Sequence, residues 1–197
     1  MRLTKIYTKV GDKGNTHLAS GQKISKASLR IEAYGTVDEL NSTIAMLRDL
    51  IQQENLLLKN VSLAELSNSI VKIQNELFDI GGELSTPCEK LDLKRQIVVS
   101  AHEVSRLENE IDQMNETLKP LENFVLPGGH IINSVAHLTR TICRRAEREV
   151  IKLNEHEEVR EDLKIYLNRL SDWLFVLSRY LSKLLNVPET LWQQKRP

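Results

Sequence analysis

Apolar residues recur along this chain at alternating intervals of three and four, the spacing that places them on one face of an α-helix. Five such segments predict helices from about residue 36, from about 62 to 82, and over 97–118, 130–155 and 158–185. The last has a heptad seam over three repeats, formed by Leu163, Leu167, Leu170, Leu174, Leu177, Leu181 and Leu184. No segment indicates a strand. We therefore predict an all-α, left-handed, up-and-down bundle of five helices.

Local signals set the expected ends of these helices. Thr36-Val-Asp-Glu39 and Ser62-Leu-Ala-Glu65 both have the residue types of a capping box, which satisfies the free N–H groups of a first turn. Gly81-Gly82 is expected to stop the second helix, and Pro120 follows the third. No linker rich in Pro, Gly or Ser divides the chain. Residues 1–197 are therefore predicted to form one domain, with the bundle spanning 36–185.

Residues 1–30 indicate no regular element. Gly11, Gly14 and Gly21 interrupt a polar stretch rich in Lys and Thr. This pattern suits a frayed terminus. It equally suits a glycine loop whose backbone donors wrap a phosphate.

Charge and composition limit the partners. Lys and Arg number 27, as do Asp and Glu, so the net charge is zero and offers no bulk attraction to nucleic acid or acidic membrane. The N-terminus lacks the apolar core of a signal peptide, and no run approaches the ~20 apolar residues of a membrane span. Cys88 and Cys143 are far apart and form no metal or redox pair. These features predict a reduced, cytoplasmic protein that binds neither nucleic acid nor membrane.

The most unusual stretch is RTICRRAER, residues 140–148. One face of this predicted helix is apolar: Val135, Leu138, Ile142, Ala146, Val150 and Leu153. The opposite face is polar: His137, Arg140, Arg144, Glu147 and Arg148, with Arg145 to one side. Guanidinium groups one turn apart repel by about 2–3 kcal/mol at an effective dielectric near 20, and by a few tenths when fully solvated. The row is either the solvated back of a helix or a site for phosphate or carboxylate.

Other polar residues each allow a structural interpretation. Asp38 would complement the helix dipole in a first turn, Asn168 would set the register of the leucine seam, and His137 would be a solvated imidazole. Phe124, in the apolar strap 123–129, would ordinarily belong to the core. No histidine has Glu three residues before it, so we predict no di-metal site, and no nucleophile motif occurs. An enzyme of this kind would orient its reactants and stabilise a polyanionic leaving group.

Five motifs in order, IYTKVGDKGNT, EAYGTVDELNS, FVLPGG, RTICRRAERE and YLNRLSDWLFVLSRY, resemble the PduO-type ATP:cob(I)alamin adenosyltransferases from Lys5 to about Tyr180. The resemblance implies a homotrimeric five-helix bundle with active sites at subunit interfaces. It also implies transfer of the 5′-deoxyadenosyl group of ATP to the Co(I) of a reduced corrinoid, with release of triphosphate. Because Co(I) is the attacking nucleophile, the protein needs none. An electron-donating reductase would be a further partner.

The resemblance also implies roles for particular residues. Those expected to bind ATP in the N-terminal loop are Thr8, Lys9, Val10, Gly11, Thr16, His17 and Lys26. Those expected to hold the nucleotide and its Mg²⁺-bound triphosphate are Arg144, Arg145, Glu147, Arg148 and Asn168. Phe124 matches an aromatic that displaces the lower axial ligand of the corrinoid. Asp38 and Arg140 match a salt bridge between subunits, and with Arg144 and Phe124 they form the expected catalytic set.

The sequence departs from the family pattern at Val10, where Thr or Asn is common, and at His17, where Ser, Thr or Arg is usual. Ala27-Ser28-Leu29 replaces an acidic-Pro run. Two other functions remain open. A non-catalytic bundle could bind a partner helix through its leucine seams, but this leaves the glycine loop and the arginines unexplained. Nucleic-acid binding is disfavoured by zero net charge and few aromatic residues.

Overall fold

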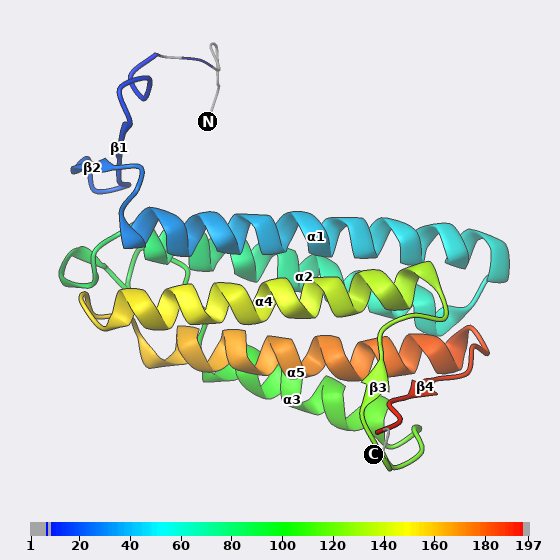
Figure 1. Ribbon diagram of the computed structural model, residues 1–197. Coiled ribbons are helices and arrows are strands. Elements are labelled where there is room, and N and C mark those ends of the chain that lie inside the picture. Colours follow the sequence, from blue (N-terminus) through cyan, green and yellow to red (C-terminus); the bar gives the residue numbers. More distant parts are fainter. Residues whose placement is uncertain (1–6, 8, 195–197) are drawn as a thin grey trace.

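The computed structural model describes residues 7 and 9–194, which form five long helices packed side by side (Figure 1). These are α1 (Leu29–Leu58), α2 (Val61–Leu84), α3 (Ala101–Asn115), α4 (Ile131–Asn154) and α5 (Glu161–Leu184), with a short 3₁₀ turn η1 at Cys88–Lys90. α1 packs against α2 and α4, α4 packs against α5, and α5 packs against α3. The all-α bundle is confirmed. None of the described helices is both long and apolar enough to cross a membrane.

The core follows the predicted periodicity. On α5 the leucines of the heptad seam are buried through Leu181, and Leu184 is half-buried. On α1 the buried apolar positions recur at the same spacing: Ala33, Val37, Leu40, Ile44, Leu47 and Ile51. Each fully buried leucine contributes about 1.5–3 kcal/mol relative to an exposed one, so these stripes dominate the stability of the bundle.

The predicted start of the first helix is wrong by seven residues. α1 begins at Leu29, where the hydroxyl of Ser28 accepts a hydrogen bond from the backbone N–H of Ile31. Thr36 lies inside the helix, where its hydroxyl donates to the carbonyl of Glu32 at 2.8 Å. The apparent capping box is therefore an internal turn. Asp38 lies in the third turn, so its predicted role at the helix dipole is also wrong.

The ends of α2 and α3 also differ from prediction. Asn60, not Ser62, caps α2, and Gly81-Gly82 does not stop the helix, which continues to the buried Leu84. α3 begins at Ala101, four residues after the predicted start, behind a capping box formed by Ser100 and Glu103, and it ends at Asn115, three residues early. α4 matches within one residue at each end, and α5 begins three residues late.

The expectation that the chain contains no strand is wrong. β1 (Asn15–His17) pairs antiparallel with β2 (Lys23–Ser25), and β3 (Val125–Leu126) pairs antiparallel with β4 (Thr190–Leu191). Strands of two or three residues are too short to show alternation in the sequence. Figure 1 shows the first hairpin beyond the start of α1 and the second pair near the opposite end of the bundle.

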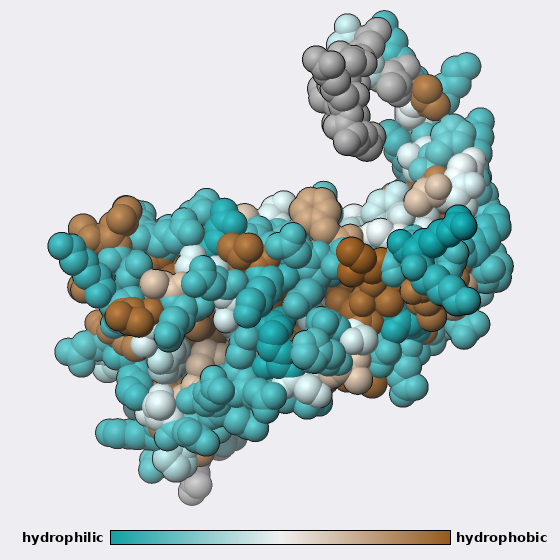
Figure 2. Space-filling model, turned by 180° about the vertical axis from the view of Figure 1, so that it is seen from behind, coloured by the Kyte–Doolittle hydropathy of each residue, from teal (hydrophilic) through white to brown (hydrophobic). Residues whose placement is uncertain are grey.

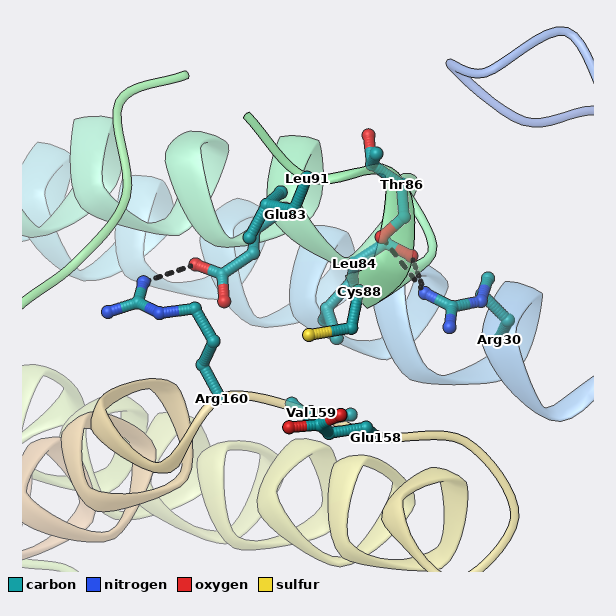
Figure 3. Close-up of a pocket in the computed structure, with 9 residues that line it drawn as sticks. All are labelled: Arg30, Glu83, Leu84, Thr86, Cys88, Leu91, Glu158, Val159 and Arg160. Carbon is teal, nitrogen blue, oxygen red and sulfur yellow. Dashed lines mark hydrogen bonds and ion pairs between the residues drawn. The ribbon is translucent and has the colours of Figure 1, made fainter. Parts of the chain in front are cut away.

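A clasp of charged side chains joins both ends of the long connection between α2 and α3 to the bundle (Figure 3). The buried guanidinium of Arg30 donates to the carbonyl of Leu84 at 2.7 Å and to the carboxylate of Glu157 at 2.6 Å. Arg160 donates to Glu83 at 3.2 Å and to the carbonyl of Val99 at 3.1 Å. The cavity between them holds only about 10 Å³, room for one water molecule. This cluster is therefore structural and fixes the start of α1 below the first hairpin.

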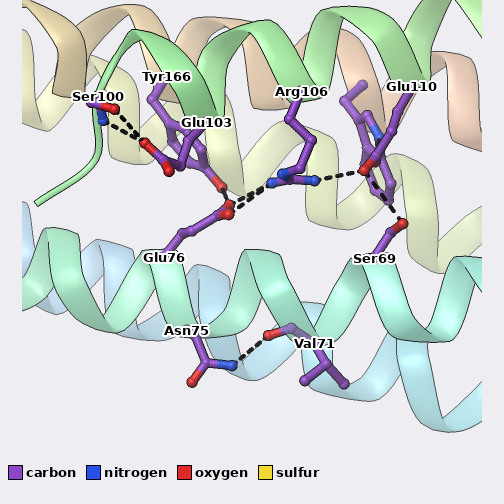
Figure 4. A network of polar contacts seen from close by, with 10 residues as sticks. Ser69, Val71, Asn75, Glu76, Ser100, Glu103, Arg106, Glu110 and Tyr166 are labelled. Carbon is purple, nitrogen blue, oxygen red and sulfur yellow. Dashed lines mark hydrogen bonds and ion pairs between the residues drawn. The ribbon is translucent and has the colours of Figure 1, made fainter. Parts of the chain in front are cut away.

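α3 is joined to α2 through polar side chains (Figure 4). Arg106 lies between Glu76 and Glu110, at 2.6 Å and 2.7 Å from their carboxylate oxygens. Tyr166 of α5 donates to Glu76, and Trp173 donates to Glu110 at 2.8 Å. Because both carboxylates are mostly buried, Arg106 is needed to offset the cost of removing them from water.

Candidate active site

Three arginines on α4 lack a counter-charge. Among the described residues, Arg140, Arg144 and Arg148 form no ion pair, although Arg148 donates to the backbone carbonyl of Arg144 at 3.2 Å. Arg144 and Arg148 are exposed. Arg140 is half-buried, and its Nε is buried without a hydrogen-bond partner among the described residues. Burial lowers the pKa of Arg140, and the charge of Arg144 lowers it further. The row is therefore a local site of positive potential on a protein of zero net charge.

Arg145 is separated from this row. Its guanidinium pairs with the carboxylate of Glu39 on α1. This pair joins α1 and α4 and neutralises one of the four arginines of the motif. Only one guanidinium nitrogen is engaged, and the Arg145 side chain remains 44% exposed.

α5 contributes one side chain next to the row. Asn168 Nδ2 donates to Glu147 Oε1 at 3.0 Å, so two residues expected to act together do lie together. Asn168 is exposed, and the prediction that it sets the register of the buried leucine seam is wrong. The amide orients the only carboxylate within the row.

The buried and exposed faces of α4 differ from the prediction near its start. His137 is only 3% exposed, whereas Leu138, expected in the core, is 50% exposed. Both ring nitrogens of His137 lack a hydrogen-bond partner among the described residues, and the ring packs edge-on against Phe175 at 6.3 Å between centroids. Burial lowers the pKa of His137, Arg140 lowers it further, and Glu189 opposes the shift. The interpretation of His137 as a solvated imidazole is therefore wrong.

The N-terminal loop forms a tight turn against Lys26. The backbone N–H of Lys26 donates to the carbonyl of Gly14 at 2.9 Å, and its Nζ would lie 2.9 Å from a Cβ built on Gly11. Lys9 and Gly14 have positive φ angles, 61° and 78°. Thus Lys9, Val10 and Gly11 lie in one loop, and Lys26, which follows β2, packs against that loop. Thr8 lies outside the described residues.

The rest of the first hairpin follows this loop. Thr16 and His17 lie on β1, where Thr16 is half-buried and His17 is exposed. Figure 1 shows the described part of this arm projecting away from the helices. In the space-filling view of Figure 2, the described part of this arm extends beyond the helical bundle of its own chain.

Asp38 points away from the arginine row. Its neighbour Glu39 faces α4, whereas Asp38 lines a groove between α1 and α2 with a volume of about 470 Å³. This groove is also lined by Tyr34, Gly35, Val37, Asn41, Leu77, Phe78, Gly81, Gly82 and Ser85. Among the described residues Asp38 forms no ion pair, so it does not meet Arg140 within one chain.

Phe124 lies in the strap that leads into the start of α4. It is 78% exposed, and its ring meets Trp192 edge-on at 6.2 Å between centroids. Gly128 and Gly129 follow with φ angles of 140° and 88°, and the N–H of Gly128 donates to Asn133 on α4 at 3.1 Å. The strap therefore presents an aromatic ring to solvent and does not bury it in the core.

Comparison with known proteins decides the family. The family model described as cobalamin adenosyltransferase matches residues 6–181. The chain belongs to this family. It is 42% identical over 196 residues to the cobalamin adenosyltransferase of Cupriavidus metallidurans, covering 99% of this chain and 97% of that protein. It is 43% identical over 179 residues to the corrinoid adenosyltransferase of Bacillus subtilis, covering 90% and 86%.

Solved structures agree with this assignment. A phenylalanine-to-alanine variant of the PduO-type ATP:corrinoid adenosyltransferase from Lactobacillus reuteri, complexed with cobalamin and ATP, superposes with a TM-score of 0.85 at 38% identity. The match covers 96% of this adenosyltransferase and 100% of that chain. An arginine-to-lysine variant complexed with ATP gives 0.84 at 37% identity, covering 95% and 100%. The predicted family and enzyme class are confirmed.

Sequence reasoning missed three features of this adenosyltransferase. Glu39 was not identified as the partner of Arg145, because a pair between two helices leaves no spacing signal. The burial of His137 was missed because the polar face was assigned from residue type alone. Trp192 was not considered, although an aromatic residue beyond the last helix signals a packed segment.

Proposed function

We propose that this adenosyltransferase transfers the 5′-deoxyadenosyl group of ATP to the Co(I) of a reduced corrinoid and releases triphosphate. The observation that carries the proposal is the row of Arg140, Arg144 and Arg148, whose guanidinium groups form no ion pair among the described residues. A polyphosphate offers oxygen atoms at a spacing that such a row can bind, and each guanidinium donates to two oxygens at once.

The chemistry needs positioning and charge stabilisation. An electron pair of Co(I) forms the bond to C5′ of ATP while the C5′–O bond breaks and its electrons stay on the triphosphate. The departing oxygen gains negative charge, which Arg144 and Arg148 stabilise in the transition state. Mg²⁺ bound to the triphosphate would supply further positive charge there. No proton transfer or protein nucleophile is required, which agrees with the absence of any such motif in the sequence.

Phe124 serves the corrinoid half of the site in this proposal. Its exposed ring would occupy the space of the lower axial ligand. Loss of that donor stabilises the lower-valent cobalt and so eases reduction of Co(II) to Co(I). The ring is 78% exposed and is therefore accessible to a ligand without rearrangement of the core.

The site is shared between subunits of a homotrimer in this proposal. Asp38 points away from Arg140 of its own chain, and the N-terminal arm projects away from the helices of its own chain. Both segments can complete the site of a neighbouring copy. An Asp38–Arg140 pair across the interface would also give the half-buried guanidinium its missing partner.

Cofactors and location follow from the same chemistry. Co(I) persists only under reducing conditions, and the two cysteines, Cys88 and Cys143, are both free thiols. We therefore place the enzyme in the cytoplasm, with an electron-donating reductase as a transient partner.

The test is an optical assay in which loss of the Co(I) corrinoid is followed after addition of Mg-ATP. We expect stoichiometric formation of adenosylcorrinoid and triphosphate, and no reaction with a non-cleavable analogue bearing a methylene at the C5′–O position. Failure of ATP to consume Co(I) corrinoid under strictly anaerobic conditions would refute the proposed function.

The roles of the residues are tested by comparing two routes. Phe124→Ala should lower turnover that starts from Co(II) and a reductant far more than turnover that starts from Co(I). Equal losses on both routes would contradict the ligand-displacing role.

A further inference from the structure

The segment after α5 folds back across the strap that carries Phe124. Asn186 has a positive φ of 54°, and the backbone N–H of Val187 donates to the carbonyl of Ser182 at 2.9 Å, which reverses the chain. Thr190–Leu191 then pairs with Val125–Leu126 as β4 and β3. The segment 186–192 is therefore the only described partner strand of the strap.

Trp192 meets Phe124 through both backbone and ring. Its N–H donates to the carbonyl of Phe124 at 2.7 Å, and its carbonyl accepts from Asn123 Nδ2 at 2.7 Å. Asn123 also accepts from the N–H of Phe124 at 2.8 Å. The two rings pack edge-to-face, with an interplanar angle of 69°. Phe124 is thus fixed at its N–H, its carbonyl and one edge of its ring.

A buried arginine ties this segment to the bundle. Arg179 of α5 is 4% exposed and donates to both carboxylate oxygens of Glu189, at 2.9 and 3.2 Å. The same guanidinium donates to the carbonyl of Lys119, at the start of the connection that leads to the strap, at 2.9 Å. Val187 lies so close to Gly129 that a Cβ there would meet its Cγ1 at 2.9 Å. The segment is therefore anchored on both sides of the strap.

We propose that Trp192 is a positioning residue that holds the Phe124 ring in the orientation needed to take the place of the lower axial ligand. This inference rests on the proposed function of Phe124. A mostly exposed ring just before a two-residue strand has few contacts of its own and would sample several rotamers in solvent. Contact with Trp192 restricts these rotamers but leaves the rest of the ring exposed to a ligand. The ring is therefore already oriented before the corrinoid binds.

The test compares Trp192→Ala with Trp192→Phe in two assays, one starting from Co(II) and a reductant and one starting from Co(I). Loss of one edge-to-face contact changes the population of the held ring by about three- to tenfold. We expect Trp192→Ala to lower the Co(II) route by that factor and the Co(I) route by less than twofold. Trp192→Phe, which keeps an aromatic edge, should restore most of the loss.

A spectroscopic signature separates positioning from a merely structural role. Electron paramagnetic resonance of bound Co(II) corrinoid, with ATP present, distinguishes four- from five-coordinate cobalt. We expect Trp192→Ala to reduce the four-coordinate fraction, with a melting temperature within about 2 °C of wild type because the side chain is 40% exposed. Ile97→Ala, an exposed apolar residue in the connection between α2 and α3 at the opposite end of the bundle, is the control and should change neither quantity.

Phe124→Ala is measured alongside to keep the two claims distinct. Selective loss of the Co(II) route in Phe124→Ala but not in Trp192→Ala would overturn the positioning role and leave the function of Phe124 intact. Unchanged behaviour of Phe124→Ala would instead remove the basis for both. Equal losses on both routes in Trp192→Ala, with the four-coordinate fraction unchanged, would also overturn the inference.

Discussion

Replacing Arg144 with Met should weaken ATP binding and, at the same time, slightly stabilise the free protein. Arg144 is exposed and lies one turn from both Arg140 and Arg148, and among the described residues none of the three forms an ion pair. Its charge therefore costs free energy in the unliganded chain and stabilises only the complex with an anion. A substitution that damages the fold lowers both the stability of the free protein and its affinity for a ligand. A variant that is more stable but binds ATP more weakly would therefore identify a ligand site.

The two magnitudes can be worked from the geometry. Side chains one turn apart lie roughly 6 Å from each other, and solvation reduces the repulsion of each exposed pair to about 0.2–0.5 kcal/mol. Removing Arg144 should therefore stabilise the free protein by about 0.5 kcal/mol, or raise its melting temperature by 1–2 °C. A charge-assisted hydrogen bond to triphosphate contributes about 1.5–3 kcal/mol, so the Kd for Mg-ATP should rise roughly 10- to 150-fold.

Calorimetric titration with Mg-ATP and thermal unfolding without ligand measure the two effects separately. Lys152→Met is the matched control, because it removes the same charge from α4 at a side chain that is 56% exposed and already near Glu149. It should leave the Kd unchanged. Arg144→Lys should keep the repulsion but lose the bidentate contact. A Kd for Arg144→Met within twofold of wild type, or a fall in stability above 1 kcal/mol, would refute the interpretation of the row as an anion site.

Three further predictions concern pH, packing and assembly. Because the pKa of His137 is lowered in the fold, the unfolded chain takes up a proton at this side chain at a higher pH than the folded chain does. The stability that depends on the neutral imidazole is therefore present above about pH 6.5 and is lost as the pH falls below that value. In urea unfolding at pH 5 and pH 7.5, the free energy of unfolding should differ less between the two pH values for His137→Met than for wild type. Arg106→Met should lower the free energy of unfolding by about 2–3 kcal/mol, since it leaves Glu76 and Glu110 without their cationic partner (Figure 4). Arg95→Met, at an exposed pair, should lower it by less than about 0.5 kcal/mol in the same urea assay. Asp38→Arg and Arg140→Asp should each dissociate the proposed trimer in sedimentation experiments, and the double variant should restore it.

Long periodic segments were predictable from sequence, and local boundary signals were not. α4 matches its predicted range within one residue and α5 within three, because about seven helical turns of consistent spacing outweigh any single residue. The start of α1 was missed because Thr36-Val-Asp-Glu39 has the residue types of a cap, although packing continues the helix back to Leu29. Gly81-Gly82 failed as a stop signal for the same reason, since Leu84 is buried one turn later. Tertiary packing overrode propensity in both places.

The candidate site was predictable where its residues share one helix. The spacing of Arg140, Arg144 and Arg148 places them on one ridge whatever the rest of the chain does. The contact between Asn168 and Glu147 came from the family resemblance and not from spacing, because it joins two helices. The pairing of the strap with residues 190–191 joins positions more than sixty residues apart, and two-residue strands carry no periodic signal.

The arrangement of α4 separates what must be fixed in this reaction from what must move. From Arg140 to Arg148 is eight residues of helix, or about 12 Å, and this spacing is held by a helix whose apolar face is buried along its length. The spacing of the three guanidinium groups proposed to bind triphosphate is therefore set by the packing of α4 and not by the ligand. The N-terminal arm is instead a short segment that projects from the bundle, the kind that opens at low free-energy cost. The strap is held by its pairing with β4 and by the buried Arg179. ATP can then enter by movement of the arm without disturbing the spacing of the arginines, because closure and spacing depend on different elements.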